Sequence, residues 1–110
     1  MDRYAFLDIE TSGLNPVLHE PIEVAYILEP DEVTVGVSLP FHEDTADPMA
    51  LEVNGYGKRP FLPMMDSFTF AKKLHGDLRD RIIVGNNVQF DMNFLRDRKS
   101  TRLNSSHGII

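Results

Sequence analysis

Three segments in the first forty residues have the apolar patterns that are typical of β-strands. Arg3–Asp8 is a short aromatic and apolar run, whereas in Glu20–Glu29 and Val33–Leu39 every second residue is apolar. Pro30-Asp31 indicates a tight connection, so the second and third strands are predicted to form a hairpin. Three consecutive strands at the start of the chain constrain its fold more than any other feature.

The rest of the pattern adds helices and a fourth strand. Asp47-Pro48 begins a short helix that ends at Asn54-Gly55, and Asp66–His75 is predicted as a second helix that ends at Gly76. Its apolar face is predicted to hold Phe68, Ala71 and Leu74. Arg81–Gly85 is a short apolar strand of the kind found centrally in a sheet, and Asp91–Arg96 begins a third helix. The order β-β-β-α-α-β-α predicts an α/β fold.

Composition limits the class of protein. The 110 residues suit one small domain, and 42% hydrophobic with 25% charged residues is a globular balance. No apolar run approaches the ~20 residues that span a bilayer, and the basic start of a signal peptide is missing, so we expect a cytoplasmic protein with no membrane partner. The absence of cysteine excludes disulfides, thiolate metal sites and thiol nucleophiles. A net charge of −6 argues against a generally basic nucleic-acid surface, but not against an enzyme that binds phosphates through metal ions held by its own carboxylates.

The C-terminal segment differs from the rest. Residues 1–96 hold 8 Lys+Arg against 16 Asp+Glu (net −8), whereas residues 97–110 hold 3 against 1 (net +2). The run DRKSTRLNSSH at 97–107 looks like the in-frame translation of a sequencing-library adapter; the alternative is an ordinary polar tail. We therefore expect residues 1–96 to be the biological part and residues 97–110 to be a non-native tail that packs poorly.

Two carboxylates lie at the end of the first strand. Asp8 and Glu10 are two residues apart, so both side chains point to one face of the sheet and can share a cation, while Ile9 points into the core. Hard divalent ions such as Mg²⁺ prefer oxygen ligands. The adjoining Thr11-Ser12-Gly13-Leu14 has a glycine for an unusual backbone and amides suited to a phosphate or a sugar end. The alternatives are two solvated acids and a plain β-turn.

A second candidate segment, at residues 85–95, follows the apolar strand and opens a helix. Asp91 is either a partner of the helix N-terminus or a third carboxylate directed towards Asp8 and Glu10. Three converging acids repel one another, which is a reason to expect a bound cation. Asn87 either orients the loop or contacts substrate.

These motifs resemble a known family. FLDIETSGL at 6–14 resembles the first motif of the DEDD superfamily of 3′–5′ exonucleases, and GNNVQFDMNFL at 85–95 resembles the second. ALEVNGY at 50–56 loosely resembles the intervening helix of DnaQ-type proofreading exonucleases. The resemblance spans residues 4–96 and implies a ribonuclease H-like mixed sheet with flanking helices, incomplete at its C-terminal end. Strands one to three would be antiparallel, with Arg3–Asp8 central and Arg81–Gly85 parallel to it.

The resemblance also implies a chemistry, two-metal phosphodiester hydrolysis with Mg²⁺ or Mn²⁺ at single-stranded 3′ ends of DNA or RNA. Asp8 would bridge both cations, Glu10 would bind one, and Asp91 would hold the second. The family's third motif, a general-base His or Tyr with a fourth carboxylate, has no counterpart after Asp91. We therefore expect a fragment of an exonuclease, inactive or weak as this chain. His19, His42, His75 and His107 are not expected to act as the base.

Substrate contacts follow from the same resemblance. Thr11 and the backbone near Ser12 and Gly13 would bind the terminal 3′-hydroxyl, and Leu14 would wedge against the last base. The complete predicted substrate-binding set is Thr11, Ser12, Gly13, Leu14, Asn87 and Phe90. Phe90 would pack near the terminal nucleotide or, alternatively, in the core. The competing functional hypotheses are a non-catalytic nucleic-acid or partner-binding module on the same fold, and a nucleotide-sensing or metal-binding regulatory domain.

Overall fold

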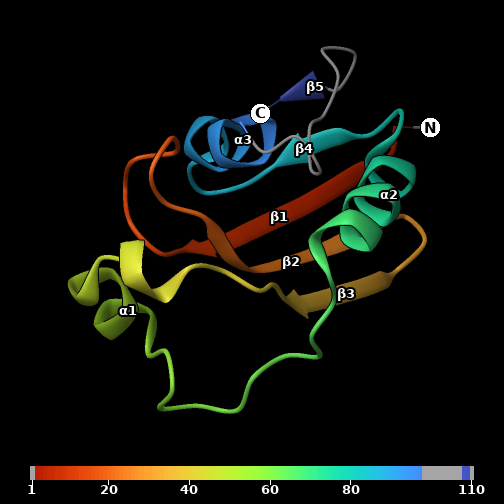
Figure 1. The fold of residues 1–110 in the computed structure, drawn as a ribbon. Coiled ribbons are helices and arrows are strands. Elements are labelled where there is room, and N and C mark those ends of the chain that lie inside the picture. The colour runs from red at the N-terminus through yellow and green to blue at the C-terminus, as the bar shows by residue number, and fades with distance from the viewer. Residues whose placement is uncertain (1, 98–107, 110) are drawn as a thin grey trace.

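The computed structural model describes residues 2–97 and 108–109 of the chain (Figure 1). The elements are, in order, β1 (Tyr4–Thr11), β2 (Pro21–Glu29), β3 (Val33–Ser38), the 3₁₀ turn η1 (Glu43–Thr45), α1 (Pro48–Asn54), α2 (Ser67–Leu78), β4 (Ile82–Val84), α3 (Val88–Asp97) and β5 (Gly108–Ile109). The described helices include none that is both long and apolar enough to cross a bilayer.

The strands form one mixed sheet in the order β3-β2-β1-β4-β5. β1 pairs with β2, and β2 with β3, in antiparallel fashion, whereas β4 lies parallel to β1. The predicted α/β fold, with three antiparallel strands and one parallel strand, is confirmed, and β1 is central. The sequence did not predict β5, which pairs parallel with β4 inside the expected tail. The other residues of that tail, 98–107 and 110, lie outside the described residues.

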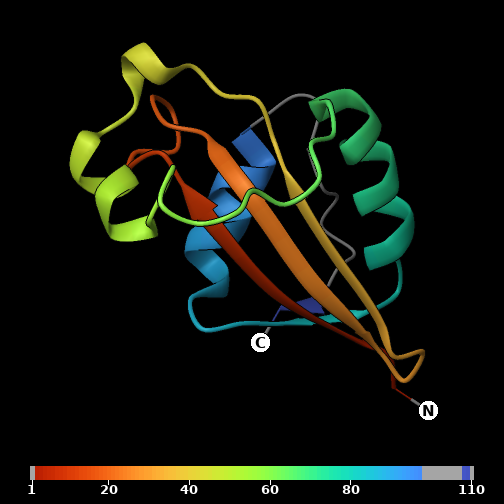
Figure 2. The same cartoon turned by 90° about the horizontal axis from the view of Figure 1, so that it is seen from below.

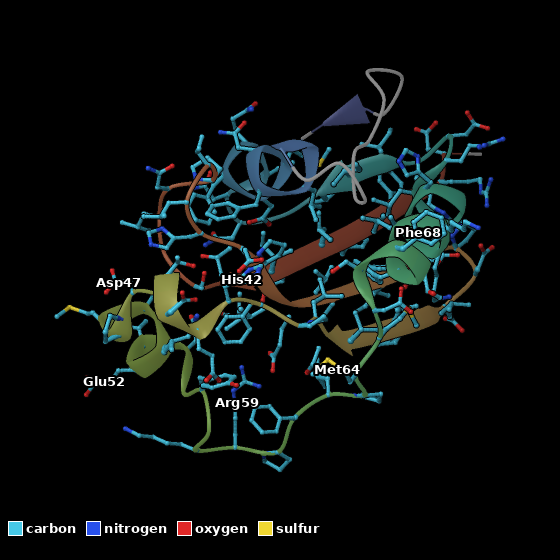
Figure 3. The ribbon with its side chains drawn as sticks, viewed as in Figure 1. His42, Asp47, Glu52, Arg59, Met64 and Phe68 are labelled. Atoms are coloured by element: carbon cyan, nitrogen blue, oxygen red, sulfur yellow. The ribbon has the colours of Figure 1, made fainter. Side chains whose placement is uncertain are left out.

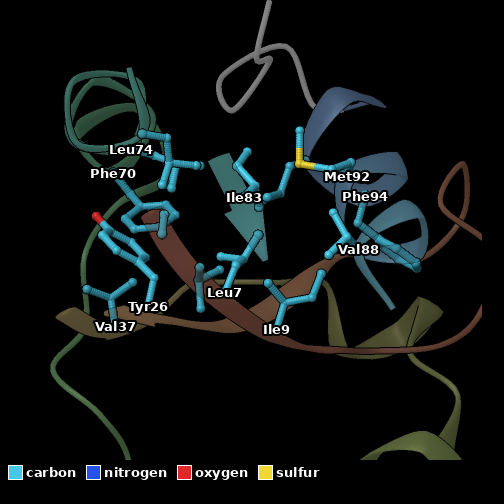
Figure 4. Packing of buried hydrophobic residues seen from close by; sticks show 14 of the residues in the cluster. Leu7, Ile9, Tyr26, Val37, Phe70, Leu74, Ile83, Val88, Met92 and Phe94 are labelled. Carbon is cyan, nitrogen blue, oxygen red and sulfur yellow. The ribbon is translucent and has the colours of Figure 1, made fainter. Parts of the chain in front are cut away.

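The core lies on one face of the sheet, beneath α2 and α3 (Figure 4). Alternation along β1 directs Leu7 and Ile9 to this face, where they are 3% and 7% exposed. Phe70 of α2 and Met92 of α3 are fully buried there. The two helices thus cover the same face because the apolar stripe of each must be buried against the sheet.

On the predicted apolar face of the second helix, Ala71 and Leu74 are buried as predicted, but the place of Phe68 and the end of the helix are wrong. Phe68 is 63% exposed, and Phe70 occupies the core position instead, beside Leu74 and Leu78. The helix also continues through Gly76 to Leu78, because Gly76 does not adopt the left-handed conformation that would end it. Burial of Leu78 offsets the ~1 kcal/mol that an interior glycine costs a helix.

The opposite face of the sheet carries Phe6, Asp8 and Glu10 of β1. Phe6 is 44% exposed on this face, which is crossed by the segment that joins α1 to α2 (Figures 1 and 2). α1 lies at the end of the sheet away from the N-terminus, where β1 ends (Figure 2). The candidate site residues are gathered at this end.

Candidate active site

The two strand carboxylates point away from the core, as predicted. Asp8 is exposed, Glu10 is half-buried, and Ile9 between them is in the core. Across β2, Glu10 stands opposite Glu23, and such like-charge pairs destabilise a sheet. Arg59, from the segment after α1 (Figure 3), donates to both carboxylate oxygens of Glu23, at 2.9 and 2.7 Å. Its guanidinium thereby balances part of the negative charge at this position.

The electrostatics of Glu10 reflect this crowding. Burial is the largest cause that raises the pKa of Glu10 above its ordinary value, and the neighbouring Asp8 raises it further. Arg59 acts in the opposite direction, while Glu23 adds a smaller upward contribution. A cation at this position would therefore be stabilised by both strand carboxylates.

Asp91 approaches these acids from α3. It lies in the first turn, where its N–H donates to the carbonyl of Asn87 at 3.1 Å, and it is 6% exposed. Burial first, and then repulsion by Asp8 and Glu10, raise the pKa of Asp91 to about 7. The sequence left two interpretations of Asp91 open, a residue at the helix N-terminus or a third carboxylate near Asp8 and Glu10. In the structure Asp91 lies in the first turn of α3 and is also coupled electrostatically to both acids.

Gly85 makes room for this approach. A Cβ at residue 85 would lie 2.8 Å from the carbonyl oxygen of Leu7 in β1, and 3.8 Å from Oδ2 of Asp91. No side chain fits between the two strands at that point. A glycine here lets the chain turn from β4 into α3 with Asp91 beside the central strand.

The carboxylates fit a hard divalent cation by chemistry. Asp8, Glu10 and Asp91 offer only oxygen donors, and their mutual repulsion makes a cation favourable. Within residues 2–97 and 108–109, however, no three acidic or histidine side chains are grouped closely enough to form a metal-binding cluster. The three acids are therefore electrostatically coupled but do not form a closed ligand set in this structure.

The loop after β1 is held by its own hydrogen bonds. The Thr11 hydroxyl donates to the carbonyl of Gly13 at 2.6 Å. Ser12 is fully buried, and its hydroxyl accepts the N–H of Glu20 at 2.9 Å, so this side chain holds the loop rather than facing a ligand. The prediction of an unusual backbone conformation at Gly13 is wrong, because the φ angle of this residue is not positive. A Cβ there would instead collide with the ring of His19.

Two cavities border this loop and the strand carboxylates. One, of about 420 Å³, is lined by Asp8 and Glu10 together with Arg59. The other, of about 380 Å³, contains four of the predicted substrate residues, Thr11, Gly13, Leu14 and Phe90. Leu14 is 78% exposed, so it is free to contact a ligand, while Phe90 also packs against the core. Phe90 thus packs against the core and also lines a cavity, while its contact with a nucleotide stays a prediction.

Asn87 has a local role. Its side-chain oxygen accepts the N–H of Phe90 at 3.4 Å, as a residue at a helix start does. It lines neither of the two cavities at the carboxylates. The observed contact thus favours the interpretation that Asn87 orients the loop over the one in which it contacts substrate.

Asn54 and Arg59 belong to the site but were not predicted. The Asn54 amide donates to the carbonyl of Thr11 at 2.8 Å, and Asn54 lines both cavities. Arg59 donates in turn to the carbonyl of Asn54 at 3.1 Å. Asn54 lies in the ALEVNGY segment, whose resemblance to a helix of DnaQ-type exonucleases could have pointed to it. Arg59 belongs to no motif from which its role could have been predicted.

The three described histidines, His19, His42 and His75, have contacts of their own or lie in a helix, and His107 lies outside the described residues. The ring of His19 accepts the N–H of Asn15 at 3.1 Å. Nδ1 of His42 lies 3.1 Å from a carboxylate oxygen of Glu20, while most of the ring is exposed. His75 is in the last turn of α2. None of the three lines either cavity at Asp8 and Glu10.

The comparison with known proteins rests on structure. No family model and no curated protein sequence matches the chain. A product-bound exonuclease I structure matches with a TM-score of 0.74 at 23% identity, over 88% of this chain and 25% of that chain. A metal-free E. coli exonuclease I–ssDNA complex matches with a TM-score of 0.73 at 24% identity. E. coli exonuclease I in complex with a dT13 oligonucleotide matches with a TM-score of 0.70 at 23% identity. Both matches cover 88% of this chain and 23% of the other chain. The chain thus spans about a quarter of the length of these exonuclease I chains, and it has the ribonuclease H-like α/β fold that they contain.

Proposed function

We propose that this chain carries the metal-binding and 3′-end-binding part of a divalent-metal-dependent 3′–5′ exonuclease. The observation that carries the proposal is the buried Asp91, whose carboxyl is coupled electrostatically to Asp8 and Glu10. Repulsion among three carboxylates is costly in a domain of this size, and a binding module without chemistry has no need for it. The exonuclease I fold agrees with this assignment.

Asp8, Glu10 and Asp91 are the side chains that would hold two Mg²⁺ or Mn²⁺ ions. Such ions supply Lewis-acid charge that activates a water and stabilises the leaving 3′-oxygen. The chain's own contribution is to hold three anionic oxygen donors at the junction of β1 and α3. Arg59 tempers the surplus negative charge at Glu10 and Glu23, which eases the approach of a phosphodiester.

The cavity lined by Thr11, Leu14 and Phe90 would hold the terminal nucleotide. Leu14 and Val53, which are 78% and 80% exposed, present apolar surface to a base. Asn54 fixes the carbonyl of Thr11 and thereby the loop that would meet the terminal sugar. Because two of the solved neighbours are complexes with ssDNA or an oligonucleotide, single-stranded DNA is the first substrate to test, with RNA beside it.

The metal part is tested by thermal unfolding during titration with Mn²⁺. A cation that binds only the folded chain raises Tm, and tenfold more Mn²⁺ above saturation raises stability by about 1.4 kcal/mol. Asp8→Asn should remove most of this gain, whereas Asp2→Asn, an exposed acid before β1, should leave it intact. An unchanged Mn²⁺ response in Asp8→Asn would refute the metal assignment.

The activity is tested with a 3′-labelled oligonucleotide in Mn²⁺. Slow release of the terminal nucleotide, abolished by Asp8→Ala, is expected. The rate should be low because neither cavity at Asp8 and Glu10 is lined by a described histidine or tyrosine, and a general base contributes about 10²–10⁴-fold. Binding of the oligonucleotide without any hydrolysis, equal in Asp8→Ala, would instead identify a non-catalytic binding module.

A further inference from the structure

A third cavity, of about 620 Å³, lies beside the end of β3. Most of its lining residues come from two segments, the one that follows β3 and the one that leads from α1 towards α2, and the rest from β2 and β3. His42 and Met64 in Figure 3 belong to these two segments. Glu23 is the residue that it shares with the cavity at Asp8 and Glu10. It is thus a separate site next to the candidate active site.

Three aromatic rings form one wall of this cavity. The ring of Tyr56 lies 5.3 Å from that of Phe41, at 81°, and 5.3 Å from that of Phe61, at 57°. Phe61 is 58% exposed, although it belongs to this cluster. Rings set at such angles offer both faces and edges to a ligand, and an aromatic face attracts a cation.

The polar lining is acidic. Glu23, Glu43 and Asp44 line the cavity together with His42, and neither lysine nor arginine is among its lining residues. Glu23 is already paired with Arg59, so the negative charge available to a ligand comes from Glu43 and Asp44. The Tyr56 hydroxyl donates to Glu43 at 3.0 Å, which holds this carboxylate next to the rings. A phosphate or a carboxylate would be repelled here, whereas a positively charged group would be attracted by the acids and the rings together.

Ser38 is among the residues that line the cavity. The residue is 3% exposed, and its Oγ is the one buried side-chain polar atom without a hydrogen-bond partner in the part of the chain that the structure describes. Its backbone is fully used, because its N–H donates to Pro63 and its carbonyl accepts the N–H of Met65. A buried hydroxyl without a partner is costly, and a ligand N–H would satisfy it.

We propose that this cavity binds an alkylammonium cation, the group of a lysine side chain or a polyamine. The aromatic wall would take the methylene chain and the charge, Glu43 and Asp44 would balance that charge, and Ser38 would accept an ammonium N–H. The proposal does not depend on the nuclease assignment, because it uses neither Asp8 nor Asp91.

Calorimetric titration of the 110-residue chain tests the charge requirement. Butylammonium should bind at least about tenfold more tightly than its neutral counterpart 1-butanol, the difference expected when a cation–π contact and ion pairs act together. The double variant Glu43→Gln with Asp44→Asn should lower the affinity for butylammonium about fivefold to tenfold. Glu52→Gln, an exposed acid of α1 outside the cavity, is the matched control and should change nothing. Equal affinity for 1-butanol, or tighter binding of uncharged deoxyadenosine, would overturn the proposal.

Ser38 allows a sharper test. Ser38→Ala removes a hydroxyl without a partner, so the variant should fold with an unchanged or raised Tm. It should weaken butylammonium binding about threefold or more, yet leave tetramethylammonium unaffected, because that ion has no N–H to donate. An equal loss for both cations would contradict the assigned role of the hydroxyl.

A lysine side chain and a polyamine both carry an alkylammonium group, and a competition experiment distinguishes them. Spermidine and the peptide acetyl-Gly-Lys-Gly-amide should both bind and compete with butylammonium. Tighter binding of the peptide would indicate a lysine of a partner protein, and tighter binding of spermidine a free polyamine. Failure of both to displace butylammonium would overturn the assignment of this ligand class.

Discussion

The buried carboxyl of Asp91 makes the stability of the fold depend on pH. Its pKa, raised to about 7 from an ordinary 3.8, means that the folded chain holds the proton more tightly than the unfolded chain. Stability must then fall as pH rises between about 4 and 7, because deprotonation is easier after unfolding. The loss is on the order of a few kcal/mol and is complete above pH 7.

We therefore predict that Asp91→Asn raises the melting temperature, by an amount that depends on pH. In EDTA at pH 8 the variant should melt several degrees above the parent, since each 1 kcal/mol moves Tm by about 4–8 °C in a domain of this size. At pH 5 the gain should be smaller, because only part of the loss has occurred there, and below about pH 4 the two proteins should melt together. Differential scanning fluorimetry across this range measures the difference, and Asp2→Asn is the surface control. An equal gain at pH 8 and pH 5 would show that burial of charge is not the cause.

Residue-level prediction from the sequence depended on local geometry. Asp8 and Glu10 were placed correctly because strand alternation alone puts them on the face opposite Ile9. The reason for Gly13 was missed, since the close approach of the His19 ring arises only when the loop has folded. Arg59 could not be predicted either: its two hydrogen bonds to Glu23 join residues 36 positions apart.

At the scale of elements, the strands were more predictable than the helices. β2 and β3 were readable because period-two alternation has only two possible faces. In α2, by contrast, both Phe68 and Phe70 fit an apolar stripe with Leu74, and only contact with the sheet decides between them. α3 begins at Val88, before the predicted Asp91, because Asn87 already serves as its cap.

The two phenylalanines of α2 provide a matched pair for testing this register. Phe70→Ala should lower the free energy of unfolding by about 3–5 kcal/mol, because it empties a fully buried position. Phe68→Ala removes an exposed ring that Lys72 covers at 4.6 Å, and should cost about 0.5–1 kcal/mol. Urea denaturation measures both. Comparable losses would mean that Phe68 is buried as well, against the observed placement of α2 on the sheet.

For the molecule as a whole, the charge of −6 determines how it can meet a nucleic acid. Proteins that bind DNA through Lys and Arg release many counterions, so their affinity falls steeply with salt. Here the described carboxylates at β1 and α3 face the proposed site, and Arg59 is already paired with Glu23. Phosphate binding must then depend on added divalent cations, if the proposed function is correct.

Fluorescence anisotropy with a labelled single-stranded oligonucleotide, carrying a 3′-terminal phosphorothioate to slow hydrolysis, tests this dependence. Binding should be negligible in EDTA and should appear with Mg²⁺ or Mn²⁺. Its salt slope should be shallow, about −0.7 for each of one or two phosphates, because few basic side chains take part. Asp8→Asn should remove the cation-dependent part. Tight binding in EDTA with a steep slope would show instead that a basic surface, and not the carboxylates, carries the contact with nucleic acid.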